Sequence, residues 1–414
     1  MESDMALILV ALRNVFRNRR RSILNIIALC LGTCLMVLGL GWVEGYHSYV
    51  YTAMQNFESG EVQLIPEGYL QEERRLPLDL NLSGYRELKD RLLSVPEVRE
   101  ATGRIDFSLR LSNRKESIYL VGRAIDPESE ANTTVLADYI HSGDYLSSQQ
   151  GGVLIGKALA ERMAVQPGDT VYIVAQDKYG VENFIDIRVA GIFNYGFPPI
   201  DKNVVFMDLA SAMDLLSMED EVTRIVMRLN QGISPEKGVS LLRRQDIGGE
   251  IHSWKTFAQA TVSAVETDTR SFYLMLIILY LLIVLGLLNS MSMSVHERTR
   301  EIGSLRALGM KRREVLGLLL AESGWISLIS AAVAVVLSMP MVWYLGSVGL
   351  DITSRMPESI PVPFGEQFYA DFRIRHFAIS LAAATLSAMV GTIRPSVKAS
   401  RLVVAEALRG GRIA

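Results

Sequence analysis

The sequence predicts an α-helical membrane protein with four transmembrane helices and a large α/β extracytoplasmic domain inserted between helices 1 and 2. The first observation is composition, because 49% of the 414 residues are hydrophobic and the mean hydropathy is +0.22, more apolar than a typical soluble chain. The second is that the apolar residues gather in four long runs. The third is that the block between the first two runs alternates strand-like and helix-like patterns.

Each apolar run is long enough to cross a membrane. The first, "ILNIIALCLGTCLMVLGLGWV", contains no charged residue, and at about 1.5 Å per residue it covers a hydrocarbon core of roughly 30 Å. It is also longer than the apolar core of a signal peptide, about 7–15 residues, so we expect it to remain as an anchor. The predicted spans are 23–45, 269–295, 315–345 and 377–393.

The distribution of Lys and Arg predicts the orientation, since positive charge marks the cytoplasmic side. Five precede the first span, six lie between the second and third, and five follow the fourth, whereas residues 44–63 have none. Both termini are therefore predicted to be cytoplasmic. The remaining segments are a cytoplasmic amphipathic segment at 1–22, the extracytoplasmic α/β domain at 46–268, a cytoplasmic segment at 296–314, an extracytoplasmic loop at 346–376 and a cytoplasmic tail at 394–414.

Residues 151–158, "GGVLIGKA", nearly match the phosphate-binding loop G-x-x-x-x-G-K-[ST]. Ala158 stands where that loop needs a hydroxyl for Mg²⁺, and the segment falls in the extracytoplasmic block, away from cytoplasmic ATP. We interpret it instead as a turn and a short strand, followed by a helix "KALAERMAV" and a strand "TVYIVAQ". A strand, a short helix and a strand recur near both ends of the block, which predicts that the two ends fold together with the middle as an insertion.

The sequence carries no recognised signature of an enzyme. Neither H-E-x-x-H nor G-x-S-x-G occurs, the five histidines share no metal-ligand spacing, and Cys30 and Cys34 both lie in the first span. A membrane-anchored enzyme is therefore disfavoured. We expect no metal or cofactor in this chain and no nucleic-acid partner.

The segment between the second and third spans, "HERTREIGSLRALGMKRREV", has the pattern of a short amphipathic helix. Ile302, Leu305 and Leu308 recur at i, i+3 and i+6, and Gly309 can end the helix before a basic cluster. The residues alone equally allow a solvated basic connector beside anionic lipid.

Glu322 is the ionisable residue of "LLLAESGWISLIS" in the third span. A charge at the centre of a span costs about 2.5–3.5 kcal/mol on insertion scales and often marks a functional site. Glu322 lies only about two turns from the basic cluster at Lys311 to Arg313. We therefore favour a structural glutamate near the cytoplasmic interface, paired with a neighbouring arginine.

Taken together, these motifs resemble the FtsX-like, MacB-type permease family of ABC transporters. "ERTREIGSLRALGMKRREV" is similar to the family signature, and "RPSVKASRLVVAEALRGG" resembles the family's C-terminal segment. "LRNVFRNRRRSILNIIALCLG" resembles its usual opening, and "VLIGKALAERMAVQPGDTVYI" resembles its external core domain. Val404 departs from the family pattern, which often has proline there.

The resemblance implies a non-catalytic permease subunit of the bacterial inner membrane with a MacB-like periplasmic core. Its partners would be membrane lipids, a second permease chain, identical or homologous, and a cytoplasmic ABC ATPase dimer that binds ATP and Mg²⁺. Movement of the ATPase would pass through segment 296–314, a coupling helix, to the external domain. The residues expected at the ATPase contact are Glu301, Ile302, Gly303, Leu305, Arg306, Ala307, Leu308 and Gly309.

For the cargo, the resemblance favours the LolC and LolE branch, which releases lipoproteins from the inner membrane to a periplasmic carrier. MacB-like efflux of peptides, toxins or drugs and FtsX-like control of a cell-wall hydrolase without transport are the alternatives. A lipoprotein cargo would need an apolar pocket between the external halves of the first two spans. Its predicted lining residues are Met36, Leu40, Val43, Tyr280, Val284 and Leu287.

Overall fold

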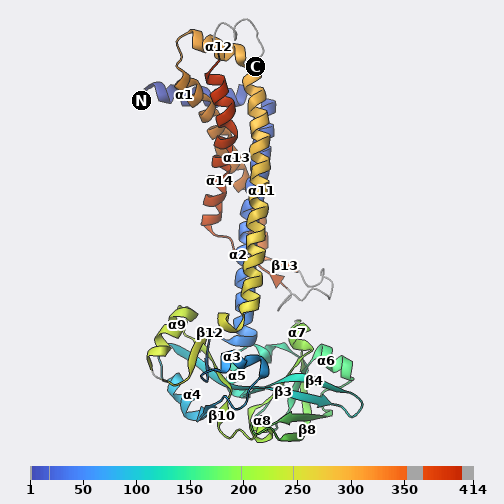
Figure 1. The fold of residues 1–414 in the computed structure, drawn as a ribbon. Coiled ribbons are helices and arrows are strands. Elements are labelled where there is room, and N and C mark those ends of the chain that lie inside the picture. The colour runs from blue at the N-terminus through green and yellow to red at the C-terminus, as the bar shows by residue number, and fades with distance from the viewer. Residues whose placement is uncertain (1, 18, 197, 246, 352–366, 403–414) are drawn as a thin grey trace. The chain divides into compact units, whose positions relative to one another are not determined.

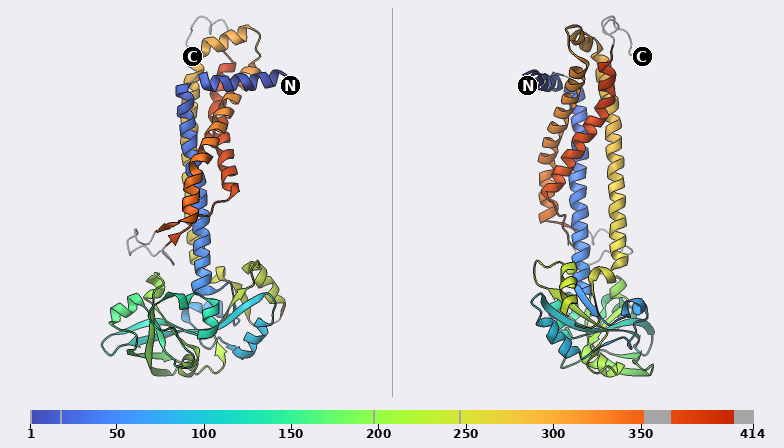
Figure 2. Two further views of the ribbon diagram at one scale, coloured as in Figure 1. Left: turned by 180° about the vertical axis from the view of Figure 1, so that it is seen from behind. Right: turned by 60° about the vertical axis from the view of Figure 1, so that its left-hand side comes forward.

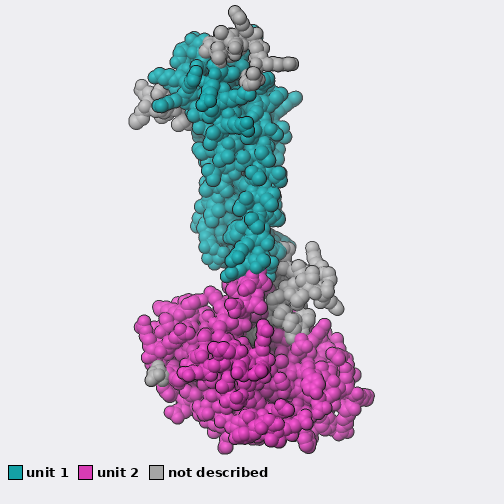
Figure 3. Space-filling model, in the orientation of Figure 1, with its two compact units in different colours: residues 1–48, 265–350, 368–414 teal, residues 49–264, 351–367 magenta. Residues whose placement is uncertain are grey.

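The computed structural model of the protein describes residues 2–17, 19–196, 198–245, 247–351 and 367–402. Val404 and most of the predicted tail lie outside the described residues. The chain forms two compact units, shown in different colours in Figure 3. Unit 1 is helical and consists of Met1–Ser48, Val265–Leu350 and Phe368–Ala414. Unit 2 is an α/β unit and consists of Tyr49–Ala264 with Asp351–Gln367.

Among the described residues, four helices are long and apolar enough to span a membrane. They are α2, α11, α13 and α14, and each contains one predicted span (Figure 1). A separate helix, α1, lies before the first of them, and a short helix, α12, lies between the second and third. The bounds are α1 Glu2–Arg17, α2 Arg19–Met54, α11 Gln259–Glu297, α12 Thr299–Ala307, α13 Arg312–Ser347 and α14 Ile374–Ser400.

Helices α2 and α11 are longer than the spans predicted within them. They have 36 and 39 residues, or about 54 and 58 Å at 1.5 Å per residue, whereas a hydrocarbon core is roughly 30 Å thick. The prediction marked only the apolar centre of each helix. Polar residues at both ends continue the helix because water can solvate their side chains while the backbone hydrogen bonds persist.

The four long helices of unit 1 run along one another, as both views in Figure 2 show, whereas α1 lies across them. Val15 of α1, Leu29 of α2 and Ile326 of α13 belong to one buried apolar cluster, which also includes Leu287 of α11 and Ala384 of α14. Small residues let helix backbones approach closely in a membrane. Gly391 of α14 is such a position, since a Cβ built there would lie 2.9 Å from the Leu287 Cβ and 3.1 Å from the Val284 carbonyl oxygen.

Unit 2 is built on a ten-stranded sheet in the order β12-β1-β11-β3-β4-β9-β6-β8-β5, with β7 pairing both β3 and β8. This double pairing closes six strands, β3, β4, β9, β6, β8 and β7, into a ring. The strands are β1 Val62–Ile65, β3 Val98–Ser112, β4 Ser117–Ile125, β5 Ile140–Gly143, β6 Val153–Gly156, β7 Thr170–Gln176, β8 Glu182–Phe193, β9 Val204–Asp208, β11 Arg224–Leu229 and β12 Glu250–Ser253.

The long strand β3 joins the two halves of this sheet. Its first part, from Val98 to Arg104, pairs with β11, and its last part, from Leu109 to Ser112, pairs with β7. On the other side of β11, strand β1 pairs with β11 and with β12. The prediction that the two ends of the external block fold together is therefore confirmed.

The "GGVLIG" segment forms strand β6, which pairs with β8 and β9 and leads into helix α6. Its backbone groups are used in the sheet, as expected for the structural interpretation. The predicted strand "TVYIVAQ" is β7, which pairs with β8 as an antiparallel hairpin. The remaining elements are α3 Tyr69–Glu72, α4 Tyr85–Leu93, α5 Pro127–Thr133, α6 Lys157–Met163, α7 Pro198–Asp201, α8 Leu209–Leu216, α9 Pro235–Leu242, α10 Trp254–Phe257 and short strands β2 Leu82–Ser83, β10 Glu221–Val222, β13 Leu350–Asp351 and β14 Gln367–Phe368, with single turns η1 Gln55–Ser59, η2 Glu73–Arg75, η3 Leu136–Tyr139 and η4 Arg243–Gln245.

The close approach of α14 to α11 predicts that Gly391→Ala destabilises unit 1 by about 1–3 kcal/mol, because the backbone oxygen of Val284 cannot move aside easily. The matched control is Gly324→Ala in α13, where a Cβ would meet nothing within 4 Å and alanine favours a helix by up to about 1 kcal/mol. Thermal unfolding of the detergent-solubilised chain measures both. A Gly391→Ala variant as stable as the control would contradict the packing.

Candidate functional site

The short helix α12 ends as its sequence predicts. Gly309 has a backbone φ of +105°, which favours glycine. Its N–H donates to the Arg306 carbonyl at 3.1 Å, and the Met310 N–H donates to the Leu305 carbonyl at 3.1 Å. These two bonds form a Schellman motif, which satisfies the last carbonyls of the helix.

The predicted contact residues of α12 do not share one free surface. Ile302 is 4% exposed and packs with Val295 and Val315, and Gly303 is also buried. Six residues correspond to about 600° around a helix, so Ile302 and Leu308 point about 120° apart. Ile302 and Gly303 are therefore covered by unit 1, and their contact with a partner stays a prediction.

The other half of α12 does present a surface. Leu308 is 86% exposed, and Ala307 and Gly309 are exposed beside it, whereas Leu305 and Arg306 are half-buried. A large apolar side chain this exposed at a helix end is available to a partner. Leu308 is thus the member of the predicted set that the structure places best for contact.

Glu301 is held by arginines of its own chain. Its carboxylate accepts from Arg298 Nε at 2.9 Å and from Arg17 Nη2 of α1. Burial raises the pKa of Glu301, but the bonds and charges of Arg298 and Arg17 outweigh it, so the pKa lies below its ordinary value. The partners of Glu301 in the structure are therefore arginines of its own chain, and its contact with an ATPase stays a prediction.

Glu322 pairs with an arginine, as predicted. Arg298 Nη1 lies 3.2 Å from Oε1 and 3.0 Å from Oε2 of Glu322, and the two side chains are 10% and 6% exposed. The partner is Arg298 at the start of α12, not the basic cluster Lys311 to Arg313. The i, i+3 spacing of Arg298 and Glu301 was a usable signal for part of this network, whereas no local pattern could have identified Arg17.

The predicted cavity residues lie in the packed helices of unit 1. Leu40 and Leu287 are 6% and 3% exposed, and the other four are half-buried. Leu287 packs against α14 at Gly391, so its side chain lies between two helices. A lateral pocket lined by the six predicted residues stays a prediction.

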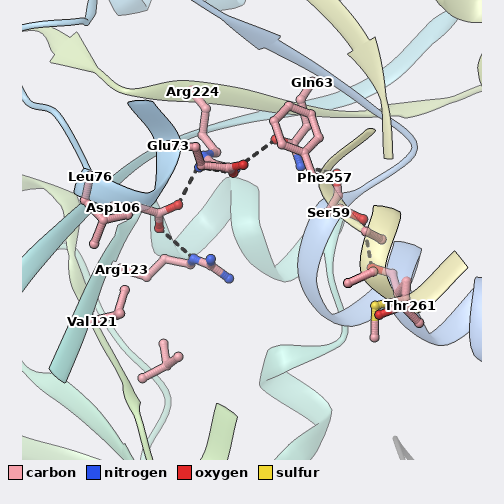
Figure 4. A pocket seen from close by; sticks show the side chains of 14 residues that line it. Ser59, Gln63, Glu73, Leu76, Asp106, Val121, Arg123, Arg224, Phe257 and Thr261 are labelled. Atoms are coloured by element: carbon pink, nitrogen blue, oxygen red, sulfur yellow. Dashed lines mark hydrogen bonds and ion pairs between the residues drawn. The ribbon is translucent and has the colours of Figure 1, made fainter. Parts of the chain in front are cut away.

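Unit 2 contains a polar pocket of about 340 Å³ that the sequence did not indicate. Figure 4 shows four charged side chains in it, Glu73, Asp106, Arg123 and Arg224, which come from different elements of the sheet and from η2. The ring of Phe257 also lines the pocket, and its centroid lies 5.4 Å from the Arg224 guanidinium carbon.

Asp106 of β3 lies at the centre of this network. Arg123 Nε of β4 donates to its Oδ1 at 2.7 Å, and Arg224 Nε of β11 lies 3.1 Å from its Oδ2. Arg224 also donates to Glu73 and Gln63, each at 3.1 Å. Burial alone would raise the pKa of Asp106, but the charges of Arg123 and Arg224 outweigh this effect and lower the pKa to about 2. The network therefore ties β1, β3, β4 and β11 together through one ionised carboxylate.

Because its pKa is lowered on folding, Asp106 should stabilise unit 2 above the unfolded pKa of about 4, and this stability should disappear as the pH falls through about 2. Asp106→Asn should cost about 3–5 kcal/mol at pH 7, since it leaves buried arginines without their carboxylate. Unfolding of a full chain in which the other three tryptophans are replaced by phenylalanine, followed from pH 7 to pH 2 by the fluorescence of Trp254, measures the difference.

The control is Asp186→Asn on β8, whose side chain is exposed, and we expect it to change stability by less than about 0.5 kcal/mol. The difference in the free energy of unfolding between wild type and Asp106→Asn should become smaller toward pH 2, because both proteins then lack the charge. A difference that is equal at pH 7 and pH 2 would exclude an ionic role for Asp106.

Two family models match the chain. The FtsX-like permease C-terminal model matches residues 273–404, which contain α12, α13, α14 and the second part of α11. The MacB-like periplasmic core domain model matches residues 22–245, more than half of the chain. Together they cover most of the helical unit and most of the α/β unit.

Individual relatives agree with these models at low identity. The chain is 22% identical over 327 residues to the lipoprotein-releasing system transmembrane protein LolC of Xylella fastidiosa, covering 76% of this chain and 78% of that protein. It is 17% identical over 407 residues to LolE of Haemophilus influenzae, covering 92% of each. It is 20% identical over 370 residues to the macrolide export ATP-binding/permease protein MacB of Campylobacter jejuni, covering 83% of this chain and 54% of that protein. The chain is a multipass membrane protein that belongs to the FtsX-like, MacB-type family of ABC transporter permeases.

Proposed function

We propose that this chain is the permease subunit of an ABC transporter of the bacterial inner membrane, and that a separate subunit of this transporter hydrolyses ATP. The observation that carries the proposal is the exposed end of α12, where Leu308 is 86% exposed beside a helix stop at Gly309. An apolar anchor at a rigid helix end is the type of side chain that fills a pocket on a partner. In this arrangement both termini are cytoplasmic and unit 2 is extracytoplasmic.

The supporting argument for a rigid contact is how α12 is held. Ile302 fixes one side of the helix in a buried apolar cluster with Val315 and Leu319, and Arg298 and Glu301 fix its beginning by ion pairs. A force on Leu308 is therefore transmitted to α11 and α13, because the helix cannot rotate freely. A solvated connector would need none of these contacts.

For the cargo we propose acylated lipoproteins, released to a periplasmic carrier by two permease chains acting with an ATPase dimer. Similarity to LolC and LolE along most of the chain supports this choice. The match to MacB supports export of another substrate as the second candidate. Met36 and Val43, which remain half-buried on α2, are the positions where an acyl chain could enter between helices.

Leu308→Asp tests the ATPase contact. It places a charge in an apolar interface, which should weaken ATPase binding by about thirtyfold or more, the loss of a hot-spot residue. Affinity of the purified chain for its ATPase subunit is the measurement. The control is Tyr179→Asp at the β7–β8 turn, also an exposed side chain, at 74%, which should leave the affinity unchanged. Equal affinities for the two variants would refute a docking role for α12.

Photo-crosslinking tests the cargo. A photoreactive residue at Met36 should label a triacylated lipoprotein more strongly than the same residue at Leu35, which is 53% exposed on another face of α2. Both are measured in proteoliposomes that contain the chain, its ATPase and a second permease. Equal labelling at the two positions would argue against a lipoprotein path, and labelling at Met36 by unacylated peptide alone would favour the export candidate.

A further inference from the structure

The joint between α11 and α12 is a single residue, Arg298. Helix α11 ends at Glu297 and α12 begins at Thr299, and Arg298 has φ −99° and ψ 13°. Its N–H still donates to the Ser294 carbonyl at 3.1 Å, and its carbonyl accepts from the Ile302 N–H at 2.9 Å. The backbone hydrogen bonds therefore run almost continuously across the joint, and the contacts of the Arg298 side chain are a further constraint on the angle between the two helices.

Two carboxylates hold that side chain from different helices. Glu322 of α13 accepts from Nη1, and Glu301 of α12 accepts from Nε. The guanidinium is planar and offers several donors in fixed directions, so two carboxylates on different nitrogens define its orientation. Glu301 in turn accepts from Arg17 at the end of α1.

Glu322 lies where an unpaired charge would be costly. Its side chain is 6% exposed, and its neighbours on α13, Leu318, Leu319 and Ser323, are also buried. Removing one member of a buried pair leaves the other uncompensated, which is why such pairs resist separation. Glu322 and Arg298 should therefore move as one body.

We propose that Glu322 is a positioning residue that locks the angle between α11 and α12 through Arg298. A push on α12 then moves α13 and α11 together, and Glu301 extends the same connection to α1 through Arg17. This inference deepens the proposed function and rests on it for the direction of force, while the lock itself is a property of unit 1. Without the lock, only the buried Ile302 and the backbone would hold α12, so its start would move more freely about Arg298 and part of the movement would be lost at the joint.

The test uses Glu322→Gln, which preserves the shape of the side chain and removes its charge. Spin labels at Ser304 of α12 and Val336 of α13, both exposed, report the distance between the helices in a full chain that lacks Cys30 and Cys34. Wild type should give one narrow distance distribution, and Glu322→Gln a broad one. In the ATPase complex the variant should bind the ATPase within about threefold of wild type but lose its stimulation roughly tenfold, within the range of coupling between sites.

The matched control is Glu297→Gln, one residue before the joint. Glu297 is 53% exposed and pairs with Arg21, so its loss removes the same charge near the joint without touching Arg298. It should leave both the distance distribution and the stimulation as in wild type. If Glu322→Gln does not insert stably, Arg298→Lys applies the same test, because lysine retains the charge but not the fixed geometry.

The outcomes separate the two proposals. A distribution for Glu322→Gln, or for Arg298→Lys in its place, as narrow as that of wild type overturns the lock, whatever the ATPase does. A broad distance distribution together with full ATPase stimulation overturns the role of the lock in coupling. Failure of the wild-type chain to bind an ATPase refutes the proposed function alone, because the distances in the isolated chain still test the lock.

Discussion

In each unit, a buried carboxylate held by arginine connects elements that are distant in the sequence. In unit 2 the carboxylate is Asp106, which brings together Arg123 of β4 and Arg224 of β11. In unit 1 it is Glu322, which holds Arg298 at the start of α12. Removing one member of such a pair lowers the free energy of unfolding by more than the pair itself contributes, because the remaining charge stays buried without hydration. The two carboxylates thus set which elements must stay together.

Local patterns in the sequence predicted most of the elements. The four apolar runs, the strands of the external block and the stop at Gly309 each depend on residues within one segment, and all appear in the structure. The ends of α2 and α11 were missed because hydropathy marks the membrane core and not the end of a helix. The pairing of β1 with β11 and β12 was predicted only as a repeated pattern, and its register had no signal.

The contacts of the candidate site were harder to predict, since they join distant residues. Arg17 and Glu301 are 284 residues apart, and no periodicity links them. The spacing of Ile302, Leu305 and Leu308 predicted one apolar face of a helix. Because side chains three residues apart do not point in the same direction, this row turns around α12, so that Ile302 is buried and Leu308 is exposed. The polar pocket of unit 2 was not foreseen, because its charges come from several strands whose order the sequence does not state.

The pairing of β1 also constrains how the chain is made. Gln63 of β1 and Arg224 of β11 are 161 residues apart, and both strands that pair with β1 come later than every strand of the six-stranded ring. At a synthesis rate of about 5–20 residues per second, β1 waits roughly ten to thirty seconds for a partner. During that time the fully buried strand Val62–Ile65 has its backbone groups unpaired, directly after a helix that is already apolar enough to enter the membrane. Delayed pairing of this kind favours aggregation, so the interval before β11 emerges is when the growing chain most needs protection by a chaperone.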